Sequence, residues 1–549
     1  MKSLRLIAFA ALCAFGLPAC GGGEPAAPRP NVLWIVWDTV RADRLGVYGY
    51  QRPTTPNLDA WARDARVYDD CISPGSWTVP SHASMFTGLL PSEHGAEHGS
   101  EWLDDKLVTI AELLRDSGYQ TFSWTANPHI SREENSTQGF ETQQHPWDKP
   151  VEERAREIYE SKLATFPADS EQRRRGERQA NSAWVLKAAG ELAQEGLSSW
   201  LNQRDAKRPY FAFLNYMEAH RPLISARRHR EAVMAPEQVE ASYNAEIDWN
   251  STWGYCFGLV DVPDESLELL SGSYDAGIHE LDSLFGDLMR ALEAQGALEN
   301  TIVVLTADHG DHLSEHHLLD HQYSVAQVLV RVPLIVKYPP RFAPGRESRP
   351  VMSMDLFPTL LELAGVEAPR VGVGHARSLL DPAERRARIT QYTKPYERPL
   401  ISTRKLYPNH DISSFERGRV AIVDKPWKLV QHLGGPTELF NLDSDPYETR
   451  NVAGENAAVL ERMRKQLVGV LKSVRPIGAG VAGERSAEHL RMLAGLGYAD
   501  VEEDSDQNDA GSDGAATSGA SKRDAEPDDA DGNDGAPRSK PASKAPQQR

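Results

Sequence analysis

Three side chains of the kind that bind divalent metal ions follow two apolar stretches of the sequence. Asp38 comes directly after residues 31–37, and Asp308 and His309 come shortly after residues 302–306. A single aspartate in such a place is commonly a helix cap or a turn former. Two carboxylates and an imidazole together suit a hard or borderline ion such as Zn²⁺ or Mn²⁺. Such an ion serves the cleavage of stable oxyanion esters, because it lowers the pKa of a nucleophile and screens an anionic substrate.

The two apolar stretches are typical of strands that are buried on both faces of a sheet. Residues 31–37 read NVLWIVW, a continuous run rich in β-branched and aromatic side chains. Strands and helices are predicted to alternate: strand 31–37, helix 107–117, strand 119–124, helix 182–201, strand 210–216, helix 267–292 and strand 302–306. This alternation predicts an α/β fold, with a mostly parallel central sheet and helices on both of its faces. Its strands deliver acidic or histidine side chains at their carboxyl ends.

The later part of the chain predicts a smaller unit. A strand is expected at 332–337 and a helix at 355–364, and segments 427–430 and 438–441 are typical of a hairpin in a smaller C-terminal sheet. Residues 132–178 are highly charged and weakly periodic. We interpret this segment as an insertion or a lid over the site.

The two ends of the chain differ from the part between them. Residues 1–19 have a basic start, an apolar run and a small residue before Cys20, which indicates a secretory signal; an N-terminal membrane anchor is the alternative. Leu17-Pro18-Ala19-Cys20 resembles the bacterial lipobox, in which the cysteine is acylated, and residues 20–30 then form a flexible tether. The sequence thus predicts an exported lipoprotein of the periplasm, anchored preferentially in the outer membrane, or of the cell surface. Residues 500–549 are predicted to be a disordered acidic tail.

Charge and cysteine content limit the partners and the redox chemistry. The tail holds 13 acidic and 6 basic residues, so −7 of the formal charge of −19 lies there. The balance argues against binding nucleic acid through a basic face. Apart from Cys13 in the signal and Cys20, only Cys71 and Cys256 remain. They either pair or are buried and free.

Most of the chain from residue 31 to 452 resembles the sulfatase family of the alkaline phosphatase superfamily. The similar segments, in order, are NVLWIVWDTVRADRLGVYGY through SWTVPSHASMFTGLLPSEHG, then TADHGDHLSEHHLLDH, RVPLIVKYPP, MDLFPTLLELAGV and ELFNLDSDPYETRNVA. The resemblance implies an alkaline-phosphatase-like α/β sandwich with a catalytic domain at 31–385 and a smaller C-terminal subdomain at 386–499. Fold alone does not define the substrate.

The nucleophile position departs from the sulfatase pattern. Sulfatases carry Cys-x-Pro-Ser-Arg, whose cysteine is oxidised to formylglycine, whereas this chain reads Thr78-Val79-Pro80-Ser81-His82. Threonine has no route to formylglycine. Four more departures accompany this one: Asp38-Thr39 replaces Asp-Asp, Asp308-His309-Gly310 replaces Asp-Asn-Gly, His82 replaces the arginine, and Thr125-Ala126-Asn127-Pro128 stands in place of Gly-Lys-Trp-His. An imidazole in place of an oxygen ligand favours zinc or manganese, although calcium or magnesium remains possible.

Threonine combined with Asp-His-Gly is instead similar to phosphoethanolamine transferases and threonine-dependent phosphodiesterases of the superfamily. That resemblance implies that Asp38, Thr78, Asp308 and His309 hold the metal, and that Thr78 attacks phosphorus to give a phosphothreonine. His220 and His321 resemble residues that contact the phosphoryl group or protonate the leaving oxygen, a role that suits an imidazole. A structural histidine is the alternative for both. His82 completes the set of candidate catalytic residues.

Three functions are compatible with these residues. The favoured one is a threonine-dependent, metal-dependent hydrolase of phosphate or sulfate esters, or a related phosphotransferase. The others are a sulfatase that works without formylglycine and a non-catalytic binding protein. The transferases usually carry several N-terminal membrane helices, and none is predicted in this sequence, so we expect hydrolysis in preference to transfer. The substrate is expected to be a small-molecule, glycan or lipid ester, and the oligomeric state is left open.

Overall fold

The computed structural model of the chain describes residues 28–178, 186, 190–245, 247–369, 375–383, 387–480 and 483–498. The predicted signal, the lipidation site Cys20 and the predicted acidic tail lie outside the described residues, as does part of the helix predicted at 182–201. Within the described ranges, no helix combines the length and the apolar character needed to cross a bilayer.

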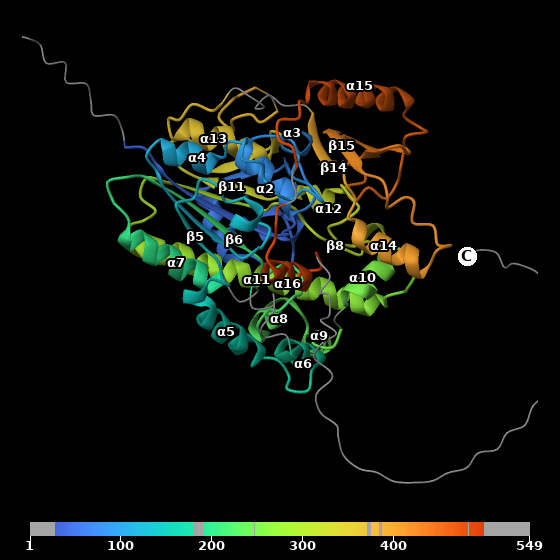
Figure 1. Cartoon of the computed structure of the whole chain (residues 1–549), viewed down its shortest axis with the longest axis horizontal. Coiled ribbons are helices and arrows are strands. Elements are labelled where there is room, and N and C mark those ends of the chain that lie inside the picture. The colour runs from blue at the N-terminus through green and yellow to red at the C-terminus, as the bar shows by residue number, and fades with distance from the viewer. Residues whose placement is uncertain are drawn as a thin grey trace, which may run out of the picture. The chain divides into compact units, whose positions relative to one another are not determined.

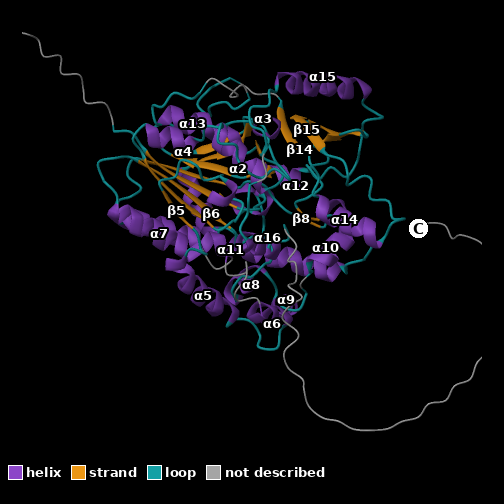
Figure 2. Ribbon diagram, in the orientation of Figure 1, coloured by secondary structure: helices purple, strands orange, loops and turns teal. Residues whose placement is uncertain are grey.

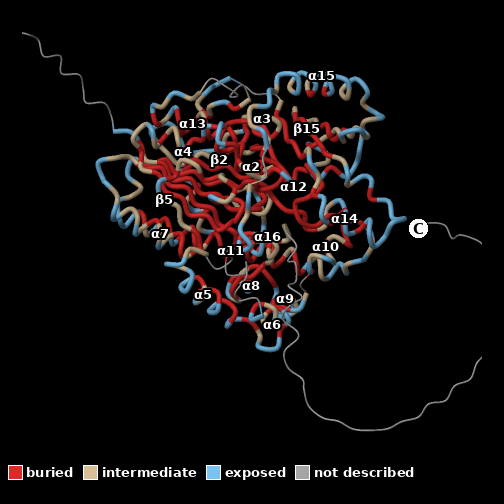
Figure 3. Tube along the Cα trace, viewed as in Figure 1, coloured by how far each residue is buried: buried red, intermediate tan, exposed pale blue. Residues whose placement is uncertain are grey.

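An eight-stranded sheet forms the centre of the molecule, as Figure 2 shows in orange. Its strand order is β12 (Gly345–Glu347), β2 (Arg66–Tyr68), β11 (Leu334–Lys337), β7 (Thr301–Thr306), β1 (Asn31–Trp37), β6 (Tyr210–Tyr216), β4 (Gln120–Thr125) and β5 (Thr142–Gln144). The five strands from β7 to β5 run parallel, and β11 is antiparallel to both β7 and β2. Strands β1, β6 and β7 are buried almost throughout (Figure 3), which explains their continuous apolar sequences. The predicted mostly parallel sheet is confirmed.

Helices cover both faces of this sheet (Figure 1). On one side lie α2 (Thr78–Thr87), α4 (Ile110–Asp116) and α13 (Leu356–Leu363), and on the other lie α7 (Gly190–Gln203), α8 (Arg227–Val233) and α11 (Asp264–Ala294). The remaining helices are α1 (Pro56–Trp61), α3 (Pro91–His94), α5 (Lys149–Leu163), α6 (Glu171–Arg178), α9 (Pro236–Ser242), α10 (Trp249–Cys256), α12 (Gln327–Val330), α14 (Glu397–Leu406), α15 (Ala457–Ser473) and α16 (Ala487–Gly495). Short strands β3 (Cys71–Ile72), β10 (Arg331–Val332) and β13 (Val351–Met352) form a small sheet of their own.

A smaller antiparallel sheet follows, as predicted. It consists of β14 (Arg388–Tyr392), β15 (Arg419–Asp424), β16 (Trp427–His432) and β17 (Thr437–Asn441), with α15 packed against β15 and β16. Its core is separate from that of the large sheet and includes Ile422, Leu429, Leu439 and Met463. The expected hairpin at 427–441 is therefore confirmed.

Residues 132–178 are attached to the large sheet and to α11. Thr142–Gln144 pairs with β4 as the edge strand β5. In α5, the buried Lys162 forms a 2.8 Å ion pair with Glu280 of α11. The role of this segment as an insertion or lid stays a prediction.

The two cysteines that the sequence left open are both buried, and neither forms a disulfide. Cys71 lies in β3, and Cys256 ends α10, where its Sγ accepts a hydrogen bond from the Leu319 amide at 3.3 Å. Burial raises the pKa of the Cys256 thiol to about 12, so it is a neutral structural group.

Candidate functional site

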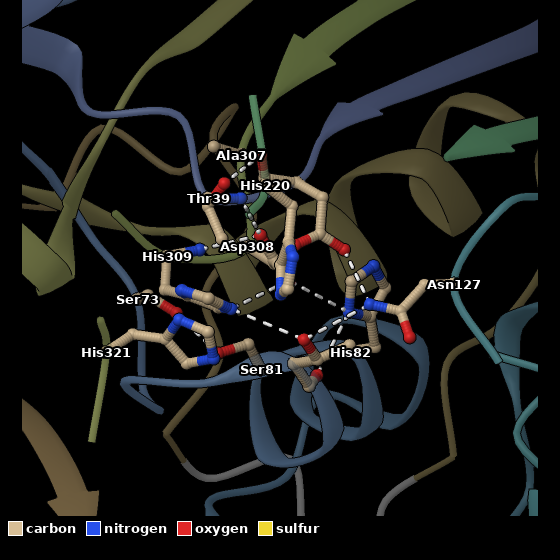
Figure 4. A network of polar contacts seen from close by, with 12 residues as sticks. Thr39, Ser73, Ser81, His82, Asn127, His220, Ala307, Asp308, His309 and His321 are labelled. Carbon is tan, nitrogen blue, oxygen red and sulfur yellow. Dashed lines mark hydrogen bonds and ion pairs between the residues drawn. The ribbon is translucent and has the colours of Figure 1, made fainter. Parts of the chain in front are cut away.

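The carboxyl ends of β1 and β7 bring Asp38, Asp308 and His309 together. The strands are parallel neighbours, with Val36 paired to Thr306, so both chains leave the sheet at the same edge. One ligand atom from each of Asp38, Asp308 and His309 lies within 4.8 Å of the others, and all three side chains are fully buried. Figure 4 shows Asp308 and His309 at the centre of a network of polar contacts.

Thr78 is the first residue of α2 and points its hydroxyl at this cluster. Its Oγ1 lies 3.4 Å from His309 Nε2. A helix N-terminus carries unpaired amides and a partial positive charge, which favour an anionic oxygen. The predicted nucleophile therefore lies beside the predicted metal ligands.

Two asparagines that the sequence did not single out as site residues support Asp38. Asn127 Nδ2 donates to Asp38 Oδ2 at 2.9 Å and to Thr78 Oγ1 at 3.4 Å, and Asn215 Nδ2 donates to Asp38 Oδ2 at 3.3 Å. Asn127 follows β4 and Asn215 lies near the end of β6, so both come from carboxyl ends of parallel strands. Asp38 and Asp308 were singled out as polar residues at the carboxyl ends of buried strands, and the same pattern would have identified both asparagines.

The electrostatics of the cluster fit a divalent cation. Burial, together with repulsion from Asp308, raises the pKa of Asp38 to about 6, and burial raises the pKa of Asp308 to about 7. Burial lowers the pKa of His309 to about 3, which keeps the imidazole neutral. Asp38 Oδ1 and Asp308 Oδ2 are buried without a hydrogen-bond partner. Two buried carboxylates with free oxygens beside a neutral imidazole are a donor set suited to such an ion.

His321 lies next to this cluster and is held by two other carboxylates. Its Nδ1 is 3.2 Å from Asp320 Oδ1 and 3.4 Å from Asp311 Oδ1, and its ring centre is 4.5 Å from that of His309. Burial lowers the pKa of His321, but the two carboxylates outweigh it, and the pKa rises to about 9. The side chain therefore carries a proton that it can donate at neutral pH.

His220 approaches from the loop after β6. Its Nδ1 lies 2.6 Å from the Arg221 carbonyl oxygen, and its ring centre is 5.5 Å from that of His321. The Nε2 atoms of both histidines point to the hydroxyl of Tyr498, at 3.2 Å from His220 and 2.7 Å from His321. Tyr498 lies far from every motif in the sequence, so no sequence pattern pointed to it.

His82 lies one turn after Thr78 on α2. Its Nδ1 is 3.0 Å from the Thr78 carbonyl oxygen and 3.5 Å from Asp308 Oδ2, while its ring packs edge-on against Phe86 and Phe213. Burial lowers the pKa of His82 to about 3. Its neutral ring does not supply the positive charge of the arginine that the sulfatase pattern has at this position.

Comparison with known proteins agrees with the geometry of the fold and the site. A sequence profile described as Sulfatase matches residues 30–366, and one described as N-sulphoglucosamine sulphohydrolase, C-terminal, matches residues 314–474. The chain belongs to the sulfatase family. It is accordingly an ester hydrolase of the sulfuric or phosphoric class.

Relatives of this sulfatase-family chain include proteins named for both ester types. An N-acetylglucosamine-6-O-sulfatase of Bacteroides thetaiotaomicron is 23% identical and covers 86% of this chain and 91% of its own. The multifunctional alkaline phosphatase superfamily protein PehA of Trinickia caryophylli is 26% identical, with 78% and 92% covered. The structure of the phosphonate monoester hydrolase SpPMH of Silicibacter pomeroyi superposes with a TM-score of 0.62 at 20% identity and covers 84% of this chain and all of the other. The predicted family and fold are confirmed.

Proposed function

We propose that this sulfatase-family chain hydrolyses phosphate esters in preference to sulfate esters, with Thr78 as its nucleophile. The observation that carries the proposal is the position of Thr78 Oγ1, 3.4 Å from His309 Nε2, beside the buried Asp38 and Asp308. A threonine hydroxyl cannot become an aldehyde hydrate, but it can form a phosphate ester. The residues present therefore favour attack on phosphorus over the sulfatase aldehyde chemistry.

Asp38, Asp308, His309 and the Thr78 hydroxyl would hold a divalent ion, with zinc or manganese favoured by the imidazole. The ion, when bound, lowers the pKa of the Thr78 hydroxyl and screens the anionic substrate. Asn127 and Asn215 hold the Asp38 carboxylate in place.

In the first step, the deprotonated Thr78 Oγ1 forms a bond to phosphorus, and the bond from phosphorus to the leaving alcohol breaks. The protonated His321, with His220 beside it, donates a proton to the departing oxygen. In the second step, water displaces Thr78 from phosphorus, and phosphate leaves. The proton lost by His321 returns from that water.

Sulfate ester hydrolysis is the second candidate, because several relatives are named as sulfatases, one of them as an N-acetylglucosamine-6-O-sulfatase. A glycan ester is for this reason a candidate substrate, beside lipid head groups and small phosphodiesters. The same side chains would serve both ester types, since both groups are tetrahedral oxyanions.

A parallel assay of the purified chain with aryl phosphate, aryl phosphodiester and aryl sulfate, with added Zn²⁺ or Mn²⁺, tests the proposal. Thr78→Ala is expected to lower kcat for the phosphoester by at least about 1,000-fold, as for other nucleophiles that act in a unit. Thr78→Ser, which keeps a hydroxyl, is expected to retain activity and to give a phosphoserine detectable by mass spectrometry after acid quench.

Thr87→Ala is the matched control, because Thr87 lies at the other end of α2, where its hydroxyl donates to the Ala83 carbonyl and accepts from the Leu89 amide. Preferred turnover of sulfate would replace the proposal with the second candidate. Unchanged phosphoesterase activity in Thr78→Ala would refute the role of Thr78.

We also propose export and lipid anchoring through Cys20, on the strength of the lipobox-like residues 17–20. Mass spectrometry of the membrane fraction is expected to find an acylated Cys20 at the N-terminus, and Cys20→Ser is expected to move the chain to the soluble fraction. A wild-type chain without acyl groups would contradict the anchor.

A further inference from the structure

The candidate site is closed to solvent in this structure. Asp38, Thr78, Asp308 and His309 have no exposed surface, and His220 and His321 are each 1% exposed. An ester cannot reach the Thr78 hydroxyl while the surrounding side chains keep these positions. Some part of the chain must move before substrate binds.

The C-terminal strap, defined here as residues 475–480 and 483–498, supplies the side chain that closes the site. Tyr498 places its hydroxyl 2.7 Å from His321 Nε2 and 3.2 Å from His220 Nε2. Burial raises the pKa of Tyr498 well above its usual value, and a hydrogen bond with Thr78 opposes the rise. One phenol oxygen thus lies within hydrogen-bond distance of both candidate proton donors.

The ring of Tyr498 is enclosed as well as its hydroxyl. Its centre lies 4.7 Å from the ring centre of His129, which packs edge-on against it. The ring centres of His220 and His321 lie 6.0 and 5.9 Å away. Three imidazoles therefore form the walls of a space that a single aromatic ring fills. Aromatic rings pack favourably edge-to-face at such separations.

The preceding residue fixes the direction in which Tyr498 enters. Gly497 has φ +85°, and a Cβ on it would lie 2.8 Å from the Trp249 ring. The Gly497 carbonyl accepts a hydrogen bond from the Tyr396 hydroxyl at 2.8 Å. Glycine is required here because it adopts this backbone conformation and leaves room for the indole.

Polar contacts attach the rest of the strap across the site. Arg485 Nε lies 2.7 Å from Glu134 Oε1, and Arg485 Nη2 lies 2.9 Å from Glu101 Oε2. His489 Nε2 lies 3.1 Å from the same Glu134 oxygen. Apolar side chains of α16 are also buried, among them Leu493. The strap is thus docked by ion pairs, by one short helix and by backbone hydrogen bonds from the Ile477 and Gly478 amides to the Glu93 carbonyl, and it is not part of a sheet.

We propose that Tyr498 is a self-ligand, whose phenol occupies the subsite for the ring-bearing alcohol of the ester, and that substrate must displace the C-terminal strap to bind. This inference rests on the proposed function, in which His220 and His321 protonate the oxygen of the leaving alcohol. The Tyr498 hydroxyl lies where both Nε2 atoms converge, which is the position expected for that leaving oxygen. A tethered phenol at that place competes with any ligand of the same chemistry. The apparent affinity of such a ligand falls by the fraction of molecules whose strap is open.

Binding of phenol, followed by ligand-observed NMR, tests the proposal without any need for turnover. In the unchanged chain the strap is expected to be open in about one tenth of the molecules or fewer, which weakens the apparent affinity for phenol by the same factor. Tyr498→Ala in the full chain removes this competition and is expected to bind phenol at least about tenfold more tightly. The same substitution is expected to lower KM for phenyl phosphate. Tyr407→Ala is the matched control, because Tyr407 is an exposed tyrosine at the end of α14.

Two further variants keep the proposal testable if Tyr498→Ala does not fold. Tyr498→Phe keeps the ring and loses only the hydroxyl, so its phenol affinity is expected to lie between those of the unchanged chain and Tyr498→Ala. Arg485→Met leaves Tyr498 in place but removes the ion pairs with Glu134 and Glu101, and it is expected to increase phenol affinity in the same direction.

Equal phenol affinity in the unchanged chain, Tyr498→Ala and Arg485→Met would overturn the proposal. A loss of kcat in Tyr498→Phe without a change in phenol affinity would also overturn it, and would make Tyr498 part of the reacting machinery. If no ester is hydrolysed by any variant but phenol affinity rises as expected, the subsite stands and the proposed function fails.

Discussion

Replacing Asn127 with alanine removes a hydrogen-bond donor from the Asp38 carboxylate and leaves every residue that would bind the cation unchanged. Asn127 is fully buried, and its Nδ2 donates to Asp38 Oδ2 at 2.9 Å. The same oxygen also accepts from Asn215, at 3.3 Å. The two asparagines therefore offer two substitutions of the same kind at different distances from one atom.

The expected loss follows from the two distances. A hydrogen bond to a charged acceptor contributes about 1.5–3 kcal/mol. At about 1.4 kcal/mol per factor of ten, Asn127→Ala is expected to weaken metal affinity and kcat/KM by about 10- to 100-fold. The longer bond from Asn215 is weaker, so Asn215→Ala is expected to cost about 3- to 10-fold.

Metal affinity is measured by calorimetric titration of chelator-treated protein with Zn²⁺ or Mn²⁺, and kcat/KM is measured at saturating metal. A thermal melt without metal separates an effect on the site from a loss of fold, because Asn127 Oδ1 also accepts a hydrogen bond from the His129 amide at 3.0 Å. Metal affinity equal to that of the unchanged chain in Asn127→Ala would refute the reasoning. A larger loss in Asn215→Ala than in Asn127→Ala would refute the ranking by distance.

Three further predictions concern the parts of the chain around the site. Lys428→Met is expected to lower the free energy of unfolding by about 3–5 kcal/mol, because it leaves the buried Glu448 without the ammonium group that lies 2.6 Å from it. Denaturant unfolding measures this loss, and the double variant Lys428→Met with Glu448→Met is expected to recover most of it. Gly310→Ala is expected to lower kcat/KM by at least about tenfold, because its Cβ would overlap the Val328 carbonyl oxygen and displace the loop after His309; activity equal to that of the unchanged chain would show that the loop adapts. Removal of metal by a chelator is expected to lower the melting temperature, and Zn²⁺ at about 100 times its Kd is expected to raise the free energy of unfolding by about 2.7 kcal/mol. A melting temperature that no divalent ion changes would contradict a metal site.

The sequence was sufficient to predict the fold because its signals are local. The buried parallel strands β1 and β7 have continuous apolar runs, and a polar residue follows shortly after each, at Asp38 and Asp308. The antiparallel hairpin of the smaller sheet also follows from a short-range pattern, since β16 and β17 are consecutive. Hydrophobic periodicity indicates which face of an element is buried, and the pattern can be recognised from residues that are close together in the sequence.

Residues 132–178 show where this kind of reasoning ends. Thr142–Gln144 has only half-buried, polar side chains, yet it forms the edge strand of the large sheet. An edge strand has a neighbour on one side only, so its side chains need not be apolar. Its position depends on β4, which no local pattern in residues 142–144 reveals.

The residue types of the site, and the strand ends from which Asp38, Asp308 and His309 come, can be read from the amino-acid sequence. How these groups act on one another depends on the folded chain. Burial sets the pKa of Asp308 to about 7 and that of His82 to about 3, and the two carboxylates that hold His321 raise its pKa to about 9. The structure alone also brings Tyr498 of the C-terminal strap into hydrogen-bond distance of His321, 177 residues earlier in the chain. Residue type and local pattern are properties of a segment, whereas desolvation and long-range contact depend on every segment that packs around it.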